Sequence, residues 1–163
     1  MADVSIKRVD YSAPGDADDL VNLLDYYARD PMGGGKPLAE SVRSRLADRL
    51  AEQPHAFSLV AYVDGEPAGL ANCFIGLSTF AAKPLVNIHD LIVKSDFRGR
   101  GIAKALFAEI EAMASAKGAC KVTLEVLSGN EPAKALYRSL GYGDYELDPA
   151  QGHALFWKKE IAA

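Results

Sequence analysis

LVNIHDLIVKSDFRGRGIAK, residues 85–104, decides the fold, because it joins an apolar strand to a helix through a short turn with two glycines. Leu85–Val93 is apolar and contains β-branched residues, which is typical of a strand. Gly99 and Gly101 let the backbone approach a ligand closely and turn several N–H groups the same way. The helix that follows adds its positive N-terminus. The stretch therefore predicts a binding site for a pyrophosphate.

The charge distribution supports a phosphate site at this turn. The whole chain carries 22 acidic and 18 basic residues, a net charge of -4. Lys94–Lys121 is nevertheless net positive, with six basic residues against three acidic ones. Arg98, Arg100 and Lys104 are placed to face phosphates there. An excess of three charges is too small for a nucleic-acid footprint, so it favours a small phosphorylated ligand and no nucleic acid.

The rest of the pattern predicts a single α+β domain over residues 1–163. Hydrophobic periodicity gives the order β-α-α-β-β-β-α-β-α-β, with no internal repeat. The predicted strands are Val4–Val9, Phe57–Val63, Ala68–Leu77, Leu85–Val93, Cys120–Val126 and His153–Ile161. The predicted helices begin at Pro14, Leu38, Ile102 and Asn130. Together these elements make a mixed sheet with helices on both faces.

Length and composition exclude several other classes. A chain of 163 residues can bury a sizeable core without disulfides or structural metal. Cys73 and Cys120 each stand alone in an apolar run, so we expect buried free thiols, a reducing compartment and no metal site. The sequence has no membrane-spanning stretch, and Met1–Val9 lacks the pattern of a signal peptide. We therefore expect a cytoplasmic protein that does not associate with membranes.

Two other phosphate-binding motifs fit the sequence less well. A dinucleotide-binding turn needs a third glycine where Lys104 stands. Gly33–Lys36 resembles part of a phosphate loop, but it follows a helix, and a proline occupies the required Ser/Thr position. We interpret this segment as a loop on the substrate side. The candidate substrate contacts are the loop Asp30–Pro37, Tyr26, Tyr27 and the loop around Phe80.

Two ordered motifs resemble the GNAT superfamily of N-acetyltransferases. Arg98–Ala103 matches the acyl-CoA signature R-x-x-G-x-A after an apolar strand. Asn130–Tyr137, followed by Leu140–Tyr142, is similar to the second motif of that family. His89–Arg98 and Asn130–Pro132 look most like the diamine acetyltransferase branch. The resemblance implies a mostly antiparallel sheet of roughly six or seven strands, about four helices and a splayed central strand pair.

The resemblance also implies an activity. Acetyl would pass directly from acetyl-CoA, without a metal, to an amine of a small molecule, including polyamine-like amines, or of a protein. Similar enzymes are often homodimers. The splayed strands would be Leu85–Val93 and Lys121–Leu127, with free backbone groups that bind the pantetheine arm. The implied cofactor-binding residues are Leu91, Ile92, Val93, Arg98, Gly99, Arg100, Gly101, Ile102, Ala103, Lys104, Asn130, Ala133 and Tyr137.

Tyr137 and His89 are the implied catalytic residues. Tyr137 matches the general acid of the family, since a phenol can give a proton to the departing thiolate. His89 lies on the strand beside the cleft, and an imidazole can take a proton from an amine near neutral pH. The diamine branch has a glutamate at this position, so Asp90, Glu125 or a water relay stays open as the base. Asp90 would lie on the opposite face unless a bulge changes the alternation of the strand.

The missing glutamate at His89 also leaves a second function open. An acyl-CoA-binding regulatory module with little catalytic activity would need no acidic base. The sequence therefore predicts an N-acetyltransferase, with such a module as the alternative.

Overall fold

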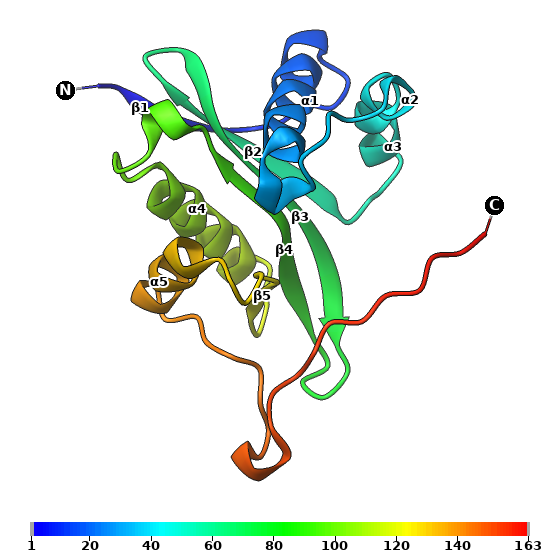
Figure 1. Ribbon diagram of the computed structural model, residues 1–163, viewed down its shortest axis with the longest axis vertical. Coiled ribbons are helices and arrows are strands. Elements are labelled where there is room, and N and C mark those ends of the chain that lie inside the picture. The colour runs from blue at the N-terminus through cyan, green and yellow to red at the C-terminus, as the bar shows by residue number, and fades with distance from the viewer. Residues whose placement is uncertain (1, 163) are drawn as a thin grey trace. The chain divides into compact units, whose positions relative to one another are not determined.

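The structure, a computed structural model, describes residues 2–162 and divides into two compact units, Met1–Leu124 and Glu125–Ala163. The first unit contains a five-stranded sheet whose strands lie in chain order (Figure 1). The strands are β1 (Val4–Arg8), β2 (Ala56–Val63), β3 (Glu66–Ser78), β4 (Lys83–Val93) and β5 (Val122–Leu124). The first four pair antiparallel and β5 pairs parallel with β4, so the sheet is mixed, as predicted.

Among residues 2–162, four helices belong to the first unit and one to the second. They are α1 (Pro14–Arg29), α2 (Glu40–Arg43), α3 (Leu46–Ala51), α4 (Ile102–Ala116) and, in the second unit, α5 (Glu131–Ser139). Short 3-10 turns occur at Pro31–Gly33, Ser95–Phe97 and Pro149–Gln151. No helix among residues 2–162 is long and apolar enough to cross a membrane.

A two-residue turn joins β2 to β3. Asp64 and Gly65 both have positive φ angles, 50° and 83°. Two successive left-handed residues form the turn type whose twist matches that of the flanking antiparallel strands. This local geometry explains why the predicted strands Phe57–Val63 and Ala68–Leu77 pair as a hairpin without a crossover helix.

Helices cover both faces of the sheet in the first unit. On one face, Leu20 and Leu23 of α1 pack in a buried cluster with Val60, Leu70 and Ile92 from the strands. Burying a side chain of this size contributes about 1.5–3 kcal/mol.

On the other face, α4 packs against Gly69, the neighbour of Leu70 on β3. A Cβ atom at Gly69 would lie 3.1 Å from Cγ2 of Ile102 and 2.9 Å from the carbonyl oxygen of Ile92. Since successive strand residues face opposite sides, α1 and α4 lie on opposite faces of the sheet. A glycine at this position lets α4 approach β3 closely.

The prediction of a last strand at His153–Ile161 is wrong. Within residues 2–162 the sheet ends at β5, so it has five strands rather than six or seven. An alternating pattern makes a segment able to pair, but a strand forms only where the backbone groups of a neighbour pair with it. Ala154 N donates to the Tyr145 carbonyl at 2.8 Å, and this contact does not extend into a ladder.

The single helix predicted from Leu38 is also wrong, because the structure has two short helices there, α2 and α3. Arg45 separates them with φ -121° and ψ -12°, outside the helical range. The break leaves Val42 of α2 exposed, whereas Leu50 of α3 is buried.

Cys73 is a buried free thiol, as predicted, but Cys120 is exposed. Cys120 precedes β5, which begins only at Val122, so it does not share the burial of a strand in the sheet. Burial raises the pKa of the Cys73 thiol to about 12, with the charge of Asp90 as a smaller cause.

We expect the two thiols to differ in reactivity, because only the thiolate attacks disulfides and the thiolate of Cys73 is suppressed at pH 8. An aromatic disulfide reagent should titrate one thiol quickly in the native protein and two in denaturant. The variant Cys120→Ser should lose the fast reaction and keep one slow thiol. Two fast thiols in the native protein would contradict the burial of Cys73.

Candidate active site

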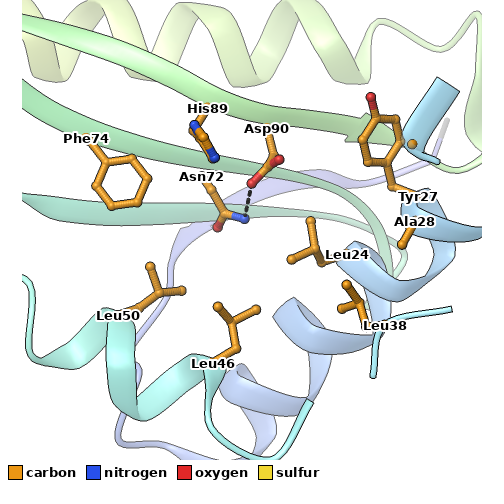
Figure 2. A pocket seen from close by; sticks show the side chains of 11 residues that line it. Leu24, Tyr27, Ala28, Leu38, Leu46, Leu50, Asn72, Phe74, His89 and Asp90 are labelled. Atoms are coloured by element: carbon orange, nitrogen blue, oxygen red, sulfur yellow. Dashed lines mark hydrogen bonds between the residues drawn. The ribbon is translucent and has the colours of Figure 1, made fainter. Parts of the chain in front are cut away.

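The register between β3 and β4 shifts by one residue at His89. Asn72 pairs with Asp90, but the next residue of β3, Cys73, pairs with Ile88, so His89 has no partner on β3. In such a β-bulge two residues of one strand oppose one residue of the other. His89 and Asp90 therefore project into the same cavity, although neighbours in a regular strand alternate (Figure 2).

A cavity of about 370 Å³ lies against this bulge. Its lining residues are Leu24, Tyr27, Ala28, Gly33, Leu38, Leu46, Leu50, Asn72, Phe74, His89 and Asp90. Figure 2 shows the side chains of β3 and β4 on one side and those of the helices on the other. All of these residues belong to the first unit. A concave, mostly apolar pocket with a few polar groups is typical of a small-molecule site.

A chain of hydrogen bonds runs through the first unit to Asp90. Asn72 Nδ2 donates to Asp90 Oδ2 at 3.0 Å, and Ser58 Oγ donates to Asn72 Oδ1 at 2.6 Å. The Tyr11 hydroxyl lies 2.8 Å from Ser58 Oγ and must be the donor there, because the hydroxyl proton of Ser58 is already used. Asn72 and Ser58 are buried. The chain fixes one oxygen of Asp90 and leaves the other, Oδ1, with no such partner in the cavity.

Aromatic side chains flank the bulge. The rings of Phe74 and His89 meet edge to face, with centroids 5.5 Å apart. Tyr27 lines the cavity, and its hydroxyl donates to the Met32 carbonyl at 3.2 Å. Burial raises the pKa of Tyr27, and the charge of Asp90 adds to the shift. The phenol of Tyr27 is therefore a neutral wall of the cavity at physiological pH.

The other proposed substrate contacts lie elsewhere. Phe80 is 91% exposed near the β3–β4 turn and does not line the cavity. The Tyr26 hydroxyl donates to Ser95 Oγ and accepts from Ser95 N, both at 3.0 Å. These hydrogen bonds lower the pKa of Tyr26. Tyr26 thus connects α1 to the turn after β4 instead of reaching the cavity.

That turn carries the residues expected to bind phosphate. Gly99 and Gly101 have φ angles of 74° and 79°, and a Cβ at either would meet no atom within 4 Å. Their backbone is therefore open to a ligand. Arg98 Nε donates to the Val93 carbonyl at 3.4 Å, and the Arg100 guanidinium lies 5.3 Å from the centre of the Phe97 ring. Arg98 and Arg100 are both exposed.

The helix α4 begins immediately after the turn. Gly101 is its N-cap, and the Gly101 carbonyl accepts from Ala105 N at 3.0 Å. Ile102 is buried and anchors the helix, Ala103 is half-buried, and Lys104 is exposed. The first N–H groups of a helix have no partner within it, so this end can accept a phosphate.

The pairing of β4 with β5 ends early. It covers Val86–Ile88 on β4, although β4 continues to Val93. Lys94 N donates to the Ala68 carbonyl on the β3 side, and alternate residues of an antiparallel strand point the same way. The backbone groups of Leu91 and Val93 therefore face away from β3, toward the edge that β5 no longer covers.

The backbone groups of Ile92 point the opposite way from those of Leu91 and Val93. Ile92 faces Leu70 on β3, and its side chain is buried in the α1 cluster. The geometry thus places Leu91 and Val93, but not the backbone N–H of Ile92, at the uncovered edge of β4.

Asn130, Ala133 and Tyr137 belong to the second unit, which is described by itself. Asn130 caps α5, since its side chain accepts from Ala133 N at 3.3 Å. This capping agrees with the predicted start of a helix at Asn130. Tyr137 stands in α5, seven residues after Asn130. Glu125, one of the alternative bases, begins this unit.

The model of the acetyltransferase (GNAT) family matches residues 20–142. The chain belongs to this family. Thialysine N-epsilon-acetyltransferases from Sus scrofa and Caenorhabditis elegans are 33% identical over 116 residues and 30% identical over 104. These matches cover 65% and 64% of this chain, and 65% and 61% of the relatives, so the chain spans less than two thirds of their length.

Solved structures agree with the GNAT fold. An aminoglycoside N-acetyltransferase in complex with CoA has a TM-score of 0.74 at 20% identity, covering 99% of this chain and 97% of its own. The α+β fold class is therefore confirmed.

Four residues that line the cavity of this GNAT-family chain were not predicted from its sequence. Leu46 and Leu50 come from α3, and Asn72 and Phe74 come from β3. A signal existed for Asn72, because an amide in the middle of an apolar strand needs a buried hydrogen-bond partner. Among residues 2–162, no cluster of three or more His, Cys, Asp or Glu side chains could hold a metal ion.

Asp25 holds the helical wall of the cavity in place. Its Oδ1 accepts from Leu38 N at 2.8 Å, and its Oδ2 accepts from Arg29 Nε at 2.8 Å. The Arg43 guanidinium lies 3.2 Å from the same Oδ2. The carboxylate is buried, and the hydrogen bond from Arg29 is the main reason that its pKa is lowered. Asp25 thus ties α1 to α2 and to the segment that carries Leu38.

Asp25→Asn should destabilise the protein at pH 7 by about 1–3 kcal/mol, because two charged donors lose their anion. A lowered folded-state pKa gives stability that is complete above the ordinary Asp pKa and is lost as the pH falls through the folded value. The difference from wild type should therefore shrink below about pH 4. Urea unfolding across this pH range measures it, with the exposed Asp48→Asn as control. A difference that does not change with pH would contradict the ion pair.

Proposed function

We propose that this protein transfers the acetyl group of acetyl-CoA directly to an amine. The observation that carries the proposal is the bulge of β4, where His89 and Asp90 line one cavity beside the part of the strand that β5 does not pair with. The same strand leads through the Gly99–Gly101 turn into α4. A pocket for an amine and a surface for a phosphorylated thioester therefore meet on one strand. Membership of the acetyltransferase family supports this reading.

The residues of the turn fit CoA. The left-handed Gly99 and Gly101 and the start of α4 would hold the pyrophosphate with backbone N–H groups. Arg98, Arg100 and Lys104 would supply positive charge around it. Ile102 and Ala103 shape the first turn of the helix. CoA bound to the aminoglycoside N-acetyltransferase of the same fold supports this assignment.

The pantetheine arm would follow the uncovered edge of β4. Leu91 and Val93 offer backbone groups there, at the place where β5 stops pairing. This arrangement supports a splayed strand pair. An N–H group at the thioester carbonyl would stabilise the oxygen as it gains charge, and a single oxyanion donor typically contributes about 3–4 kcal/mol.

His89 and Asp90 would have different roles toward the acceptor amine. The Asp90 carboxylate, fixed by Asn72, binds the ammonium form of the acceptor. The imidazole of His89 then takes the proton, which frees the nitrogen lone pair for attack. Both side chains line the cavity, which favours them over Glu125 or a water relay.

The second unit would complete the reaction. Acetyl-CoA supplies the acetyl group and CoA leaves as a thiolate, which Tyr137 would protonate. The second proton lost by the acylated nitrogen would then restore the phenol of Tyr137. Asn130 and Ala133, at the start of α5, would contact the arm of CoA. The family match runs to residue 142 and so crosses the boundary between the units, which supports one functional domain over residues 1–163.

We also propose a cytoplasmic protein whose acceptor is a small-molecule or peptide amine. The thialysine-specific names of the relatives support a small amine. Neither nucleic acid nor a membrane is a proposed partner, and a homodimer is compatible with the family.

A thiol-release assay tests the activity. With acetyl-CoA and a panel of primary amines, at least one amine should stimulate CoA release well above hydrolysis, and mass spectrometry should find the acetylated amine. The alternative, an acyl-CoA-binding module, predicts CoA binding in calorimetry without amine-stimulated release. That result across the panel would overturn the proposal.

Variants of the two proposed catalytic residues should lower the rate of the chemical step, whereas variants of the proposed phosphate-binding arginines should lower the affinity for CoA. His89→Ala and Tyr137→Phe should each lower kcat by about 10²–10⁴ while the affinity for CoA changes little, because each removes a proton-transfer group. Steady-state kinetics together with calorimetry separates the two effects. Wild-type turnover in either variant would remove that residue from the mechanism.

Arg98→Ala and Arg100→Ala should instead weaken CoA binding about tenfold each, since a charge-assisted hydrogen bond of about 1.4 kcal/mol is lost. Calorimetry with CoA measures the change. Arg49→Ala is the matched control, because Arg49 is exposed and pairs with the exposed Glu52 on α3 and its C-cap. Equal affinities in all three variants would contradict the pyrophosphate assignment.

A further inference from the structure

We infer that the acceptor is a small primary amine with a single positive charge on an apolar body, such as an aryl-alkyl or branched alkyl amine. The inference rests on the proposed function and names the substrate class of the same cavity. It distinguishes this chain from relatives whose names specify thialysine or aminoglycosides.

The charges of the cavity carry the argument. Asp90 is the one carboxylate among the eleven lining residues, and none of these residues is a lysine or an arginine. His89 is the other titratable side chain beside it, apart from the phenol of Tyr27. One half-buried anion matches one ammonium group. A second or third ammonium of a polyamine or an aminoglycoside would have no partner in the cavity.

Two carboxylates on the helical side, Asp25 and Asp30, do not change this count. Asp25 is paired with Arg29 and Arg43 and also accepts from Leu38 N. Asp30 accepts from Met32 N at 2.9 Å as the cap of the 3-10 turn at Pro31–Gly33. Neither side chain lines the cavity. A further ammonium group that packs against the apolar lining without a partner pays a desolvation penalty, so a polycation should bind less well than a monoamine of similar size.

The wall opposite Asp90 is apolar. Figure 2 shows Leu24, Leu46 and Leu50 across the cavity from the Asn72–Asp90 hydrogen bond, with Phe74 at one end. A ring or branched alkyl group attached to the amine would displace water from these side chains. Each buried CH₂ group favours binding by a factor of about four. An acceptor with such a body should therefore be used much better than a short alkyl amine.

The test compares values of kcat/KM for four named amines with the wild-type protein. 2-Phenylethylamine should exceed ethylamine, spermidine and kanamycin at least tenfold. Ethylamine has the same ammonium group without the apolar body, whereas the other two carry additional charges. A preference for spermidine or kanamycin would overturn the inference and leave the acetyltransferase activity intact.

A negative charge added to the apolar wall should reduce the preference for a monoamine over a diamine. Leu46 is half-buried and lines the cavity, so Leu46→Glu places a second carboxylate opposite Asp90. The ratio of kcat/KM for 2-phenylethylamine over putrescine should fall at least tenfold. Leu77→Glu is the matched control, because Leu77 is 64% exposed on β3 outside the cavity, and its ratio should equal that of wild type. An unchanged ratio in Leu46→Glu, with folding verified by circular dichroism, would contradict the assigned wall.

A binding measurement separates failure of the inference from failure of the proposed function. If no amine stimulates CoA release, the proposed function fails. Calorimetric titration of 2-phenylethylamine and spermidine into the full chain with CoA then decides the inference alone. Tighter binding of 2-phenylethylamine, weakened at least tenfold by Asp90→Asn, supports the cavity assignment, and tighter binding of spermidine overturns it.

Discussion

The rest of the site depends on one extra residue in β4. Before His89, Ile88 is buried on the face covered by α4, and after it Ile92 is buried on the face covered by α1. Without the bulge, a single alternation could not satisfy both halves of the strand, because a shift of one residue exchanges the two faces. The two hydrophobic layers therefore hold the bulge in place. In doing so they point two adjacent polar side chains, His89 and Asp90, into one cavity.

Polar groups are brought into an apolar region only where their partners come with them. Asn72 and Ser58 are buried, and each is used by the hydrogen-bond chain that begins at Tyr11 and ends at Asp90. Among residues 2–162, no buried side-chain nitrogen or oxygen atom lacks a partner. Such complete networks rigidify their members, since any movement would leave a polar group unpaired. Asp90 is therefore held by residues from the loop before α1, from β2 and from β3.

Much of the fold followed from local patterns, and the errors have physical causes. The first five strands and the starts of α1, α4 and α5 were predicted, because periodicity, Gly and Pro positions and the Asn130 cap act within a few residues. His153–Ile161 was wrong because a strand depends on a neighbour that the pattern does not reveal. The helix from Leu38 was wrong because its leucine spacing continues across the break at Arg45.

The candidate site likewise has features that the local sequence predicts and features that it does not. The Arg98–Lys104 turn was visible in the sequence, since glycine freedom and local charge are properties of a short segment. The bulge and the leucine wall were not visible, because both arise from the pairing and packing of distant segments. Asp90 shows this best. It was named as a possible base from the sequence, but the face of the sheet on which its side chain lies depends on the register between β4 and β3.

The helical wall of the cavity has a consequence for how such a protein diversifies. Its lining residues fall between Leu24 and Leu50, one continuous stretch that ends before β2 begins. The turn at Arg98–Lys104 lies far downstream and shares no residue with it. Substitutions or changes of length in the early stretch can reshape the cavity while the β4 register and the Arg98–Lys104 turn stay intact. The helical wall of the cavity and the Arg98–Lys104 turn are thus separate segments of the chain that can change independently.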